Sequence, residues 1–142
     1  MTYPVIITED PETGQVMVTF PDVPEAMTVG RDSTDALYWA LDALLVALSG
    51  YMDQGRQIPR PSPAPSHLPE ISLPALASAK LAVYEAMRRQ GMTQVALAQK
   101  LGVDPRQIRR LLDLDHKSRI DQVEAALKAL GLRLIISVKE AA

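Results

Sequence analysis

Cysteine is absent from this chain of 142 residues, and histidine occurs only twice. Without thiols, the chain cannot form a disulfide or hold a thiolate-bound metal. His67 and His116 lie far apart, one in a proline-rich segment and the other in a predicted loop. A histidine-based site is therefore not expected, and we predict no catalytic residue, no metal site and no cofactor.

Aromatic residues are scarce, with one Trp and one Phe. Because 47% of the residues are hydrophobic, the core is expected to be aliphatic. Long apolar runs are also missing: the longest nearly uncharged stretch, residues 43–52, is far shorter than the roughly 18 residues that cross a bilayer. No charged start followed by an apolar run opens the chain. These absences predict a cytoplasmic protein with no membrane partner.

Net charge is only −2, but it is unevenly distributed. Residues 1–59 hold two basic and nine acidic side chains, for a net charge of −7. Residues 60–142 hold thirteen basic and eight acidic side chains, for a net charge of +5. Such a division favours two partners of opposite charge. The basic part suits nucleic acid, and the acidic part suits a basic molecule.

The N-terminal part is predicted to form a small antiparallel sheet and one long helix. Residues 3–8 and 15–20 predict a hairpin, and residues 27–29 predict a third short strand. Asp32 or Ser33 is expected to cap a helix that ends at Gly55. Its predicted buried stripe lies beside a stripe of alanines, which favours either close packing or simply helix. The two stripes are Leu37, Leu41, Leu44, Leu48 and Met52, and Ala36, Ala40, Ala43 and Ala47.

Prolines alternate in residues 58–65, which predicts an extended, semi-rigid linker. Residues 71–73 have the alternation of a strand and are expected to return to the sheet before Pro74. The predicted domains are residues 1–58 and residues 75–142, separated by the linker and returning strand at 59–74.

Residues 92–112 are predicted to form two short helices joined by a tight turn. Thr93 is suited to cap the first helix, and Gly102 permits the turn. Asp104 followed by Pro105 is a typical beginning for the second helix, which points Ile108 inward. This is the pattern of a helix-turn-helix, whose second helix enters the major groove of DNA.

The second helix leaves polar side chains on its outer face that suit guanine, adenine or phosphate. With neighbouring positions they make up the predicted DNA-binding residues, which are Thr93, Gln94, Arg106, Gln107, Arg109, Arg110 and Lys117. The alternative is a helical hairpin whose arginines are simply solvated.

Two further helices are predicted around this pair. Residues 75–90 form one, with Leu76, Val83 and Met87 inward and Gly91 as its stop. Ser118 and Asp121 resemble a capping pair for the other, whose apolar stripe is Ile120, Val123, Leu127 and Leu130.

Residues 132–138 predict a terminal strand with an unpaired edge. Pairing with the same strand of a second copy would satisfy that edge. Leu134, Ile135 and Ile136 are therefore the predicted dimerisation residues, and the chain is expected to be a homodimer or a higher homo-oligomer.

The chain as a whole resembles the HicB antitoxins of bacterial type II toxin–antitoxin systems. The resemblance covers both halves and includes the helix-turn-helix pattern. The other matching residues are Tyr3, Pro4, Phe20, Pro21, Asp22, Val23, Pro24, Thr28, Val29, Gly30, Ala36, Leu37, Ala40, Ile58, Pro59, Pro61, Ser62, Leu73, Pro74, Lys80, Leu81 and Tyr84. In one departure, Glu25 and Ala26 stand where the family usually has a Gly-Cys or similar small pair.

This resemblance implies an α+β fold: a partial RNase H-like domain, with a small antiparallel sheet and one long helix, followed by a helical DNA-binding domain. That second domain is expected to end in the short strand. The implied function is to bind a HicA-type toxin, a small basic ribonuclease that cleaves mRNA, and to repress the chain's own operon by binding operator DNA. Asp10, Asp22 and Glu25 in the acidic half are then the candidate toxin contacts.

Two other functions compete with this one. The first is a stand-alone transcriptional regulator whose N-terminal domain senses a ligand or only oligomerises. The second is a metal-dependent nuclease that uses Asp10, Asp22, Glu25 and Asp35. Because turn formation or helix capping accounts for Asp10 and Asp35, we expect the chain not to be an enzyme.

Overall fold

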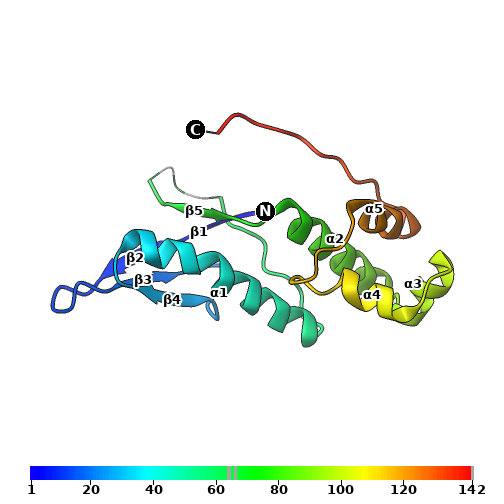
Figure 1. The fold of residues 1–142 in the computed structure, drawn as a ribbon, viewed down its shortest axis with the longest axis horizontal. Helices are drawn as coiled ribbons and strands as arrows, with labels where there is room; N and C mark the ends of the chain where they lie inside the picture. Colours follow the sequence, from blue (N-terminus) through cyan, green and yellow to red (C-terminus); the bar gives the residue numbers. More distant parts are fainter. Residues whose placement is uncertain (64, 66, 142) are drawn as a thin grey trace. The chain divides into compact units, whose positions relative to one another are not determined.

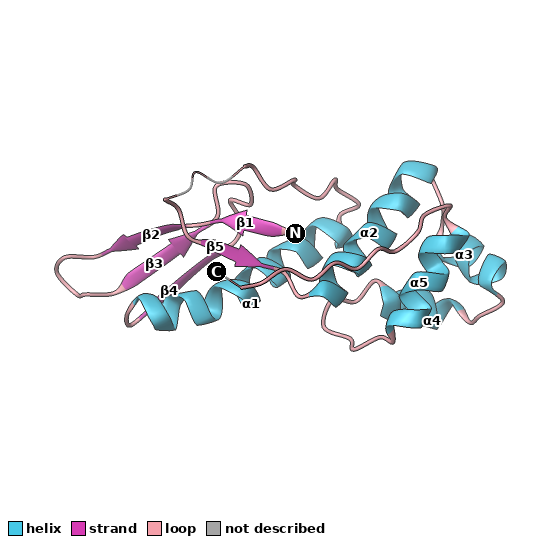
Figure 2. Ribbon diagram, turned by 90° about the horizontal axis from the view of Figure 1, so that it is seen from above, coloured by secondary structure: helices cyan, strands magenta, loops and turns pink. Residues whose placement is uncertain are grey.

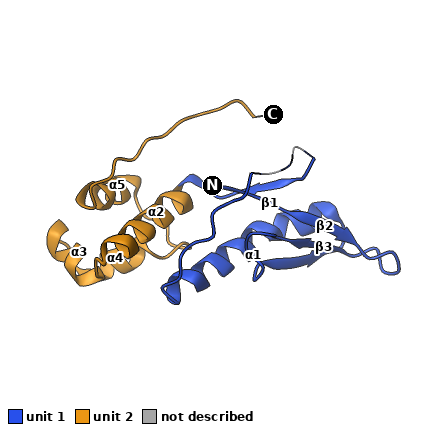
Figure 3. Cartoon of the chain, turned by 180° about the vertical axis from the view of Figure 1, so that it is seen from behind, with its two compact units in different colours: residues 1–75 blue, residues 76–142 orange. Residues whose placement is uncertain are grey.

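The computed structural model describes residues 1–63, 65 and 67–141. Ala64 and Ser66 of the predicted linker, and Ala142 at the chain end, lie outside the described residues. The chain divides into two compact units, Met1–Ala75 (unit 1) and Leu76–Ala142 (unit 2) (Figures 1 and 3). Strands and one long helix make up unit 1, and helices make up unit 2. The predicted α+β class is confirmed.

Unit 1 is built on two antiparallel sheets. In one of them, β2 (Ile6–Glu9), β3 (Val16–Thr19) and β4 (Met27–Gly30) lie side by side in that order. In the other, β1 (Thr2–Pro4) pairs with β5 (Glu70–Ser72). Tyr3 lies opposite Ile71 in this pair. The predicted return of residues 71–73 as a strand is therefore confirmed, and its partner is the very start of the chain.

The single strand predicted over residues 3–8 is wrong, because the structure has two strands there with a break at Val5. The side chain of Val5 is fully buried, and its N–H donates to the Pro69 carbonyl at 2.9 Å. The chain thus changes its pairing partner at Val5, from β5 to β3. A run of β-branched residues contains no signal for such a change of partner.

Helix α1 (Ser33–Asp53) covers one face of the three-stranded sheet (Figures 1 and 2). Its N-cap is Asp32, one of the two residues predicted for this role, and the Asp32 carboxylate accepts from the Asp35 N–H at 2.8 Å. Its buried residues are Ala36, Ala40, Leu44, Leu48 and Tyr51. The predicted stripe is therefore only partly correct, since Leu37, Leu41 and Met52 are only half-buried.

The start of this buried face is occupied by a small residue, Ala36, which lies very close to Gly30. A Cβ atom at Gly30 would lie 2.6 Å from the Cα of Ala36 and 2.9 Å from its Cβ. The end of β4 and the first turn of α1 therefore approach too closely for any side chain at Gly30. Of the predicted alanine stripe, Ala36 and Ala40 are buried, whereas Ala43 and Ala47 are half-buried.

The segment after α1 is extended, and side chains of the sheet region hold it. The Tyr3 hydroxyl donates to the Pro59 carbonyl at 2.6 Å. The Asp22 carboxylate accepts from the N–H of Ser62 at 2.8 Å and from its hydroxyl at 2.6 Å. Burial, with a smaller effect from Asp22, raises the pKa of Tyr3 to about 12. Residues 56–63 contain no helix or strand, so these contacts attach them to unit 1.

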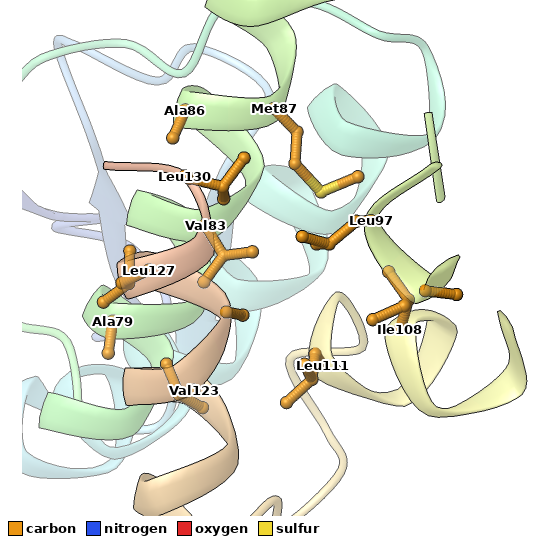
Figure 4. Packing of buried hydrophobic residues seen from close by; sticks show 12 residues of the cluster. Ala79, Val83, Ala86, Met87, Leu97, Ile108, Leu111, Val123, Leu127 and Leu130 are labelled. Atoms are coloured by element: carbon orange, nitrogen blue, oxygen red, sulfur yellow. The ribbon is translucent and has the colours of Figure 1, made fainter. Parts of the chain in front are cut away.

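Unit 2 is a cluster of short helices: α2 (Ala75–Gln90), α3 (Gln94–Leu101), α4 (Pro105–Leu111) and α5 (Ile120–Ala129). Their apolar faces meet in one aliphatic core (Figure 4). Each helix contributes a fully buried residue to it, and these are Val83, Leu97, Ile108 and Val123. The predicted inward positions are confirmed with two exceptions: Leu76 is only partly buried, and Ile120 is 46% exposed at the first turn of α5.

The strand predicted over residues 132–138 does not form within the single chain. This segment is extended but forms no strand, because a strand needs a partner for its N–H and C=O groups. In the part of unit 2 that the structure describes, the regular elements are helices and provide no such partner. Leu134 packs partly against the helical core, while Ile135 and Ile136 are 74% and 71% exposed.

The capping role predicted for Ser118 is also wrong. Ser118 is buried, and its hydroxyl lies 3.4 Å from the Arg110 carbonyl and 3.0 Å from Nδ1 of His116. The N-cap of α5 is instead Arg119, which makes no side-chain capping hydrogen bond. Asp121 accepts from the Arg119 guanidinium at 2.8 Å.

Candidate functional site

The helices α3 and α4 begin and end where local chemistry requires. The Thr93 hydroxyl accepts from the N–H of Ala96 at 3.0 Å and so caps α3. Gly102 ends α3 in the left-handed region, at φ +68°, where a side chain would be strained. Asp104 is the N-cap of α4, and Pro105 takes its first position. The two predicted helices and the turn between them are confirmed.

The predicted DNA-binding residues all lie on the surface of unit 2. Thr93 and Gln94 are exposed at the start of α3, and Lys117 is exposed in the loop after α4. The largest group lies on α4 itself, where Arg106, Gln107, Arg109 and Arg110 are exposed while Ile108 and Leu111 between them are buried. The structure therefore separates an apolar inner face of α4 from a basic outer face.

One of these arginines is held by its own helix cap. The Arg106 guanidinium donates to the two carboxylate oxygens of Asp104 at 3.2 and 3.1 Å. Asp104 also accepts from the Arg106 N–H at 2.8 Å. These bonds keep the pKa of Asp104 below its usual range. The geometry sets Arg106 apart from Arg109 and Arg110, since only Arg106 is oriented by an adjacent carboxylate.

Lys80 is a buried cation that the sequence analysis noted only as part of the family resemblance. It lies on α2 and has no exposed surface. Its ammonium donates to three backbone carbonyls: Arg110 at 3.0 Å, Asp113 at 2.6 Å and His116 at 2.6 Å. All three donors of the ammonium are thereby used. Lys80 thus anchors the C-terminal end of α4 and the loop that carries Lys117.

Burial lowers the pKa of Lys80, although the nearby Asp113 and Asp115 act in the opposite direction. Carbonyls at the C-terminal end of a helix carry partial negative charge, which favours a cation there. A signal for this role was present in the sequence. Lys80 lies three and seven residues before Val83 and Met87, so it falls on the apolar face of its helix. A lysine on such a face needs a buried partner.

The three candidate toxin contacts in unit 1 occupy different places. Asp10 accepts from the Glu12 N–H at 2.9 Å in the turn between β2 and β3, and this bond lowers its pKa. Asp22, in the loop after β3, binds Ser62. Glu25, later in the same loop, accepts from the Tyr51 hydroxyl at 2.7 Å and from Arg56 at 3.3 Å. Each carboxylate supports local structure.

The same geometry bears on the nuclease alternative. Asp35, the fourth carboxylate considered for it, accepts from the Arg31 N–H at 2.9 Å at the start of α1. Within the described residues, no three His, Asp or Glu side chains come together as a metal site requires. The described carboxylates of unit 1 therefore offer no ready-made metal centre.

Comparison with known proteins agrees with this architecture. The family described as "HicB_like antitoxin of bacterial toxin-antitoxin system" matches residues 2–82. The chain belongs to the HicB-like antitoxin family. The match covers all of unit 1 except Met1, and the first half of α2. This HicB-like antitoxin therefore has the family's characteristic region in the unit that carries the sheet.

Relatives extend the similarity over almost the whole chain. Antitoxin HicB of Escherichia coli strain K12 is 41% identical over 134 residues, which are 94% of this chain and 96% of that protein. Antitoxin HicB 2 of Photorhabdus laumondii is 40% identical over 134 residues, covering 94% of each. Antitoxin HicB of Pseudomonas fluorescens is 37% identical over 131 residues, which are 92% of this chain and 90% of that protein. The likeness therefore includes α3 and α4.

Among the described residues of this HicB-like antitoxin, no helix combines the length and the apolar character that crossing a membrane requires.

Proposed function

We propose that this HicB-like antitoxin neutralises a HicA-type toxin through unit 1 and represses its own operon by binding operator DNA through α4. The two short helices α3 and α4, whose sequence has the pattern of a helix-turn-helix, support the second role. Since both partners act in the cytoplasm, the proposed location is cytoplasmic. None of these roles requires a catalytic group of this chain.

The observation that supports DNA binding is the outer face of α4. Three arginines and a glutamine are exposed there, on a helix whose inner face is fixed in the core of unit 2. Unit 2 as a whole carries twelve basic and seven acidic side chains, for a net charge of +5. A phosphate backbone favours such a surface, and arginine and glutamine suit base edges.

Operator binding can be tested in mobility-shift experiments at two salt concentrations. Arg106→Ala and Arg110→Ala, if these residues read bases, are each expected to weaken operator binding roughly ten- to a hundredfold and to relax sequence preference. Arg109→Ala and Lys117→Ala are expected to weaken all sequences about equally and to flatten the salt dependence.

The matched control is Lys128→Ala, which removes an exposed positive charge from α5 in the same unit. It should leave the operator affinity within about a factor of two. If all four variants of the preceding experiment bind as the wild type does, α4 does not face DNA.

Toxin neutralisation is supported by the family and by the charge of unit 1. Unit 1 holds three basic and ten acidic side chains, for a net charge of −7, and a ribonuclease must carry basic residues to bind RNA. Opposite charges speed the encounter of two proteins. A chain carrying both Arg106→Ala and Arg110→Ala should therefore still rescue cells that express the toxin, although it no longer represses. A stand-alone regulator would instead repress without rescuing growth.

Homodimer formation is proposed through the C-terminal segment. The exposed side chains of Ile135 and Ile136 lie in an extended segment, and a second copy of that segment would satisfy its backbone. Ile135→Pro removes a backbone donor and should lower the sedimentation mass and the operator affinity together. Lys139→Pro, beyond the apolar run, should change neither. An Ile135→Pro chain of unchanged mass and affinity would rule out this interface.

A further inference from the structure

A groove of about 500 Å³ lies on unit 1 between β4 and α1. Its strand side consists of Met27, Thr28 and Val29, and Trp39 and Val46 lie on its helix side. The two elements belong to the same compact unit, so the groove is part of one packed structure. The predicted toxin contacts Asp10 and Asp22 do not line it, whereas Glu25 does.

Three large apolar side chains that line the groove are exposed. Met27 is 55% exposed, Trp39 49% and Val46 66%. Trp39 is the only tryptophan of the chain, and its ring makes an edge-on contact with the Tyr38 ring. Large apolar side chains gathered on one surface are typical of a binding site. Tryptophan and methionine are also enriched in the centres of protein interfaces.

Beside the groove, the outer edge of β4 has no neighbouring strand. β4 is the last strand of its sheet and pairs with β3 on one side only. The outer edge of such a strand presents N–H and C=O groups with no strand partner. Apolar side chains beside an open strand edge are what a segment of polypeptide needs for binding.

The charge of the groove lining indicates which kind of molecule binds there. Two carboxylates, Glu25 and Asp42, line the groove, and no basic residue does. Glu25 is paired with Arg56 at 3.3 Å, so Asp42 is the main source of negative charge in the lining. Phosphates of a nucleic acid would be repelled by this lining and by the net charge of unit 1. A second copy of the chain is also disfavoured, because a two-fold axis through the groove would bring the same carboxylates of both copies together. A basic protein satisfies both the apolar surface and the charge.

We propose that this groove is the docking surface for the basic toxin. An apolar side chain of the toxin inserts between Met27, Trp39 and Val46, and its basic residues lie against Asp42 and Glu25. The inference rests on the proposed toxin neutralisation and specifies the surface responsible. Among the three predicted carboxylate contacts, it retains Glu25 and replaces Asp10 and Asp22 with Asp42.

The test is calorimetric titration of the full-length chain with a catalytically inactivated HicA-type toxin. Val46→Glu is expected to weaken binding at least tenfold. The site is exposed on a helix, where glutamate is at least as favourable as valine, so the fold is retained. The substitution also adds a negative charge, which by itself would attract a basic toxin. A loss of affinity therefore reports on the apolar contact.

Ile6→Glu is the matched control. Ile6 is 44% exposed on β2, the strand at the opposite edge of the same sheet. This variant should bind within about twofold of the wild type. If Ile6→Glu and Val46→Glu weaken binding equally, the toxin covers the open face of the sheet and the groove proposal is wrong.

A second pair of variants tests the charges. Asp42→Lys should weaken binding at least tenfold, whereas Glu12→Lys, in the turn between β2 and β3, should weaken it less than threefold. Both variants change the net charge by the same amount. Equal effects would mean that only the overall charge of unit 1 matters, which would contradict docking at the groove.

Trp39 provides a direct readout in the same titrations. Its emission should shift to shorter wavelength as the toxin covers it, and Trp39→Phe should abolish the change. If the wild type forms no complex at all, the proposed toxin neutralisation fails. The wild type could instead bind with no change in Trp39 emission, and Val46→Glu and Asp42→Lys could bind with unchanged affinity. In that case only the groove proposal fails.

Discussion

The two units are stabilised over very different distances along the chain. In unit 1, the first strand pairs with residues that follow about half of the chain later, and Tyr3 binds Pro59. In unit 2, helices that are neighbours in sequence pack on one another, as α3 and α4 do. Local contacts form with little loss of chain entropy, whereas distant contacts must first close a long loop. The comparison indicates that unit 2 is specified mainly by local signals and unit 1 by its long-range pairing.

The units also differ in how they use charge. Unit 2 buries one cation, Lys80, against backbone carbonyls and keeps its arginines outside. Unit 1 keeps its carboxylates at the surface, where they accept from backbone N–H groups, hydroxyls and Arg56. Substitutions in one unit at a time therefore test this comparison. Trp39 fluorescence reports on unit 1 alone, because unit 2 has no tryptophan.

The largest effect is expected from Lys80→Met in unit 2. Methionine fills a similar space but leaves three carbonyls without their donor, so the free energy of unfolding should fall by about 3 kcal/mol. Thermal unfolding followed by the helical circular dichroism signal measures this loss. Lys100→Met, at an exposed position of α3, should change the stability by less than about 0.5 kcal/mol. Equal losses in the two variants would mean that Lys80 has no anchoring role.

Gly30→Ala should have the next largest effect, confined to unit 1. The new Cβ would meet the backbone of Ala36, and overpacking of this kind costs about 2 kcal/mol. Urea unfolding monitored by Trp39 fluorescence gives the measurement. Gly50→Ala in α1, where nothing lies within 4 Å of the added Cβ, should instead stabilise unit 1 by about 0.5–1 kcal/mol. A stable Gly30→Ala chain would show that β4 and α1 can separate without cost.

A smaller effect is expected at the cap of α3. Thr93→Ala removes the hydroxyl that accepts from the Ala96 N–H and should lower the stability of unit 2 by about 1 kcal/mol. Thr93→Ser keeps a hydroxyl at the same place and should restore most of the loss. Both variants can be compared by the helical circular dichroism signal, while Trp39 fluorescence should remain unchanged. A transition that moves in both signals would mean that the two units unfold together.

The smallest expected effect is a loss of folding stability at low pH. Folding lowers the pKa values of Asp10, Glu25 and Asp35 in unit 1 and of Asp104 in unit 2. For Glu25 the Tyr51 hydroxyl is the main cause. The unfolded chain then binds more protons than the folded chain, so stability falls as pH falls from about 5 toward 3. Unit 1, with three such groups, should lose more than unit 2.

Unfolding measured at several pH values by Trp39 fluorescence and by circular dichroism checks this order. Glu25→Gln should flatten the dependence seen by Trp39 more than that of the circular dichroism signal, to which the helices of both units contribute. If unit 2 is the more sensitive to acid, the surface carboxylates of unit 1 contribute little to its fold.

Features that depend on local contacts could be predicted from the sequence, whereas several that depend on long-range contacts could not. Thr93, Gly102, Asp104 and Pro105 act on the backbone within four residues of themselves, so α3 and α4 could be predicted together with their exposed arginines. The N-cap of α1 at Asp32 was predictable for the same reason.

The errors arose where a partner lies far away or outside the chain. The break at Val5 depends on Pro69, and the use of the Ser118 hydroxyl depends on Arg110. Residues 132–138 have the composition of a strand but find no strand partner in their own unit. Lys80 could have been recognised as a buried lysine from its helical face, but its three carbonyl partners depend on how the loop after α4 folds.

The pairing of β1 with β5 has a consequence for the newly made chain. The first strand leaves the ribosome early, yet its partner, Glu70–Ser72, is synthesised about 70 residues later. At about 5–20 residues per second, this delay lasts several seconds. During that time β1 has an open strand edge. Unit 1 is therefore complete only when residues 70–72 have emerged, and a chain that stops before residue 70 cannot close this sheet.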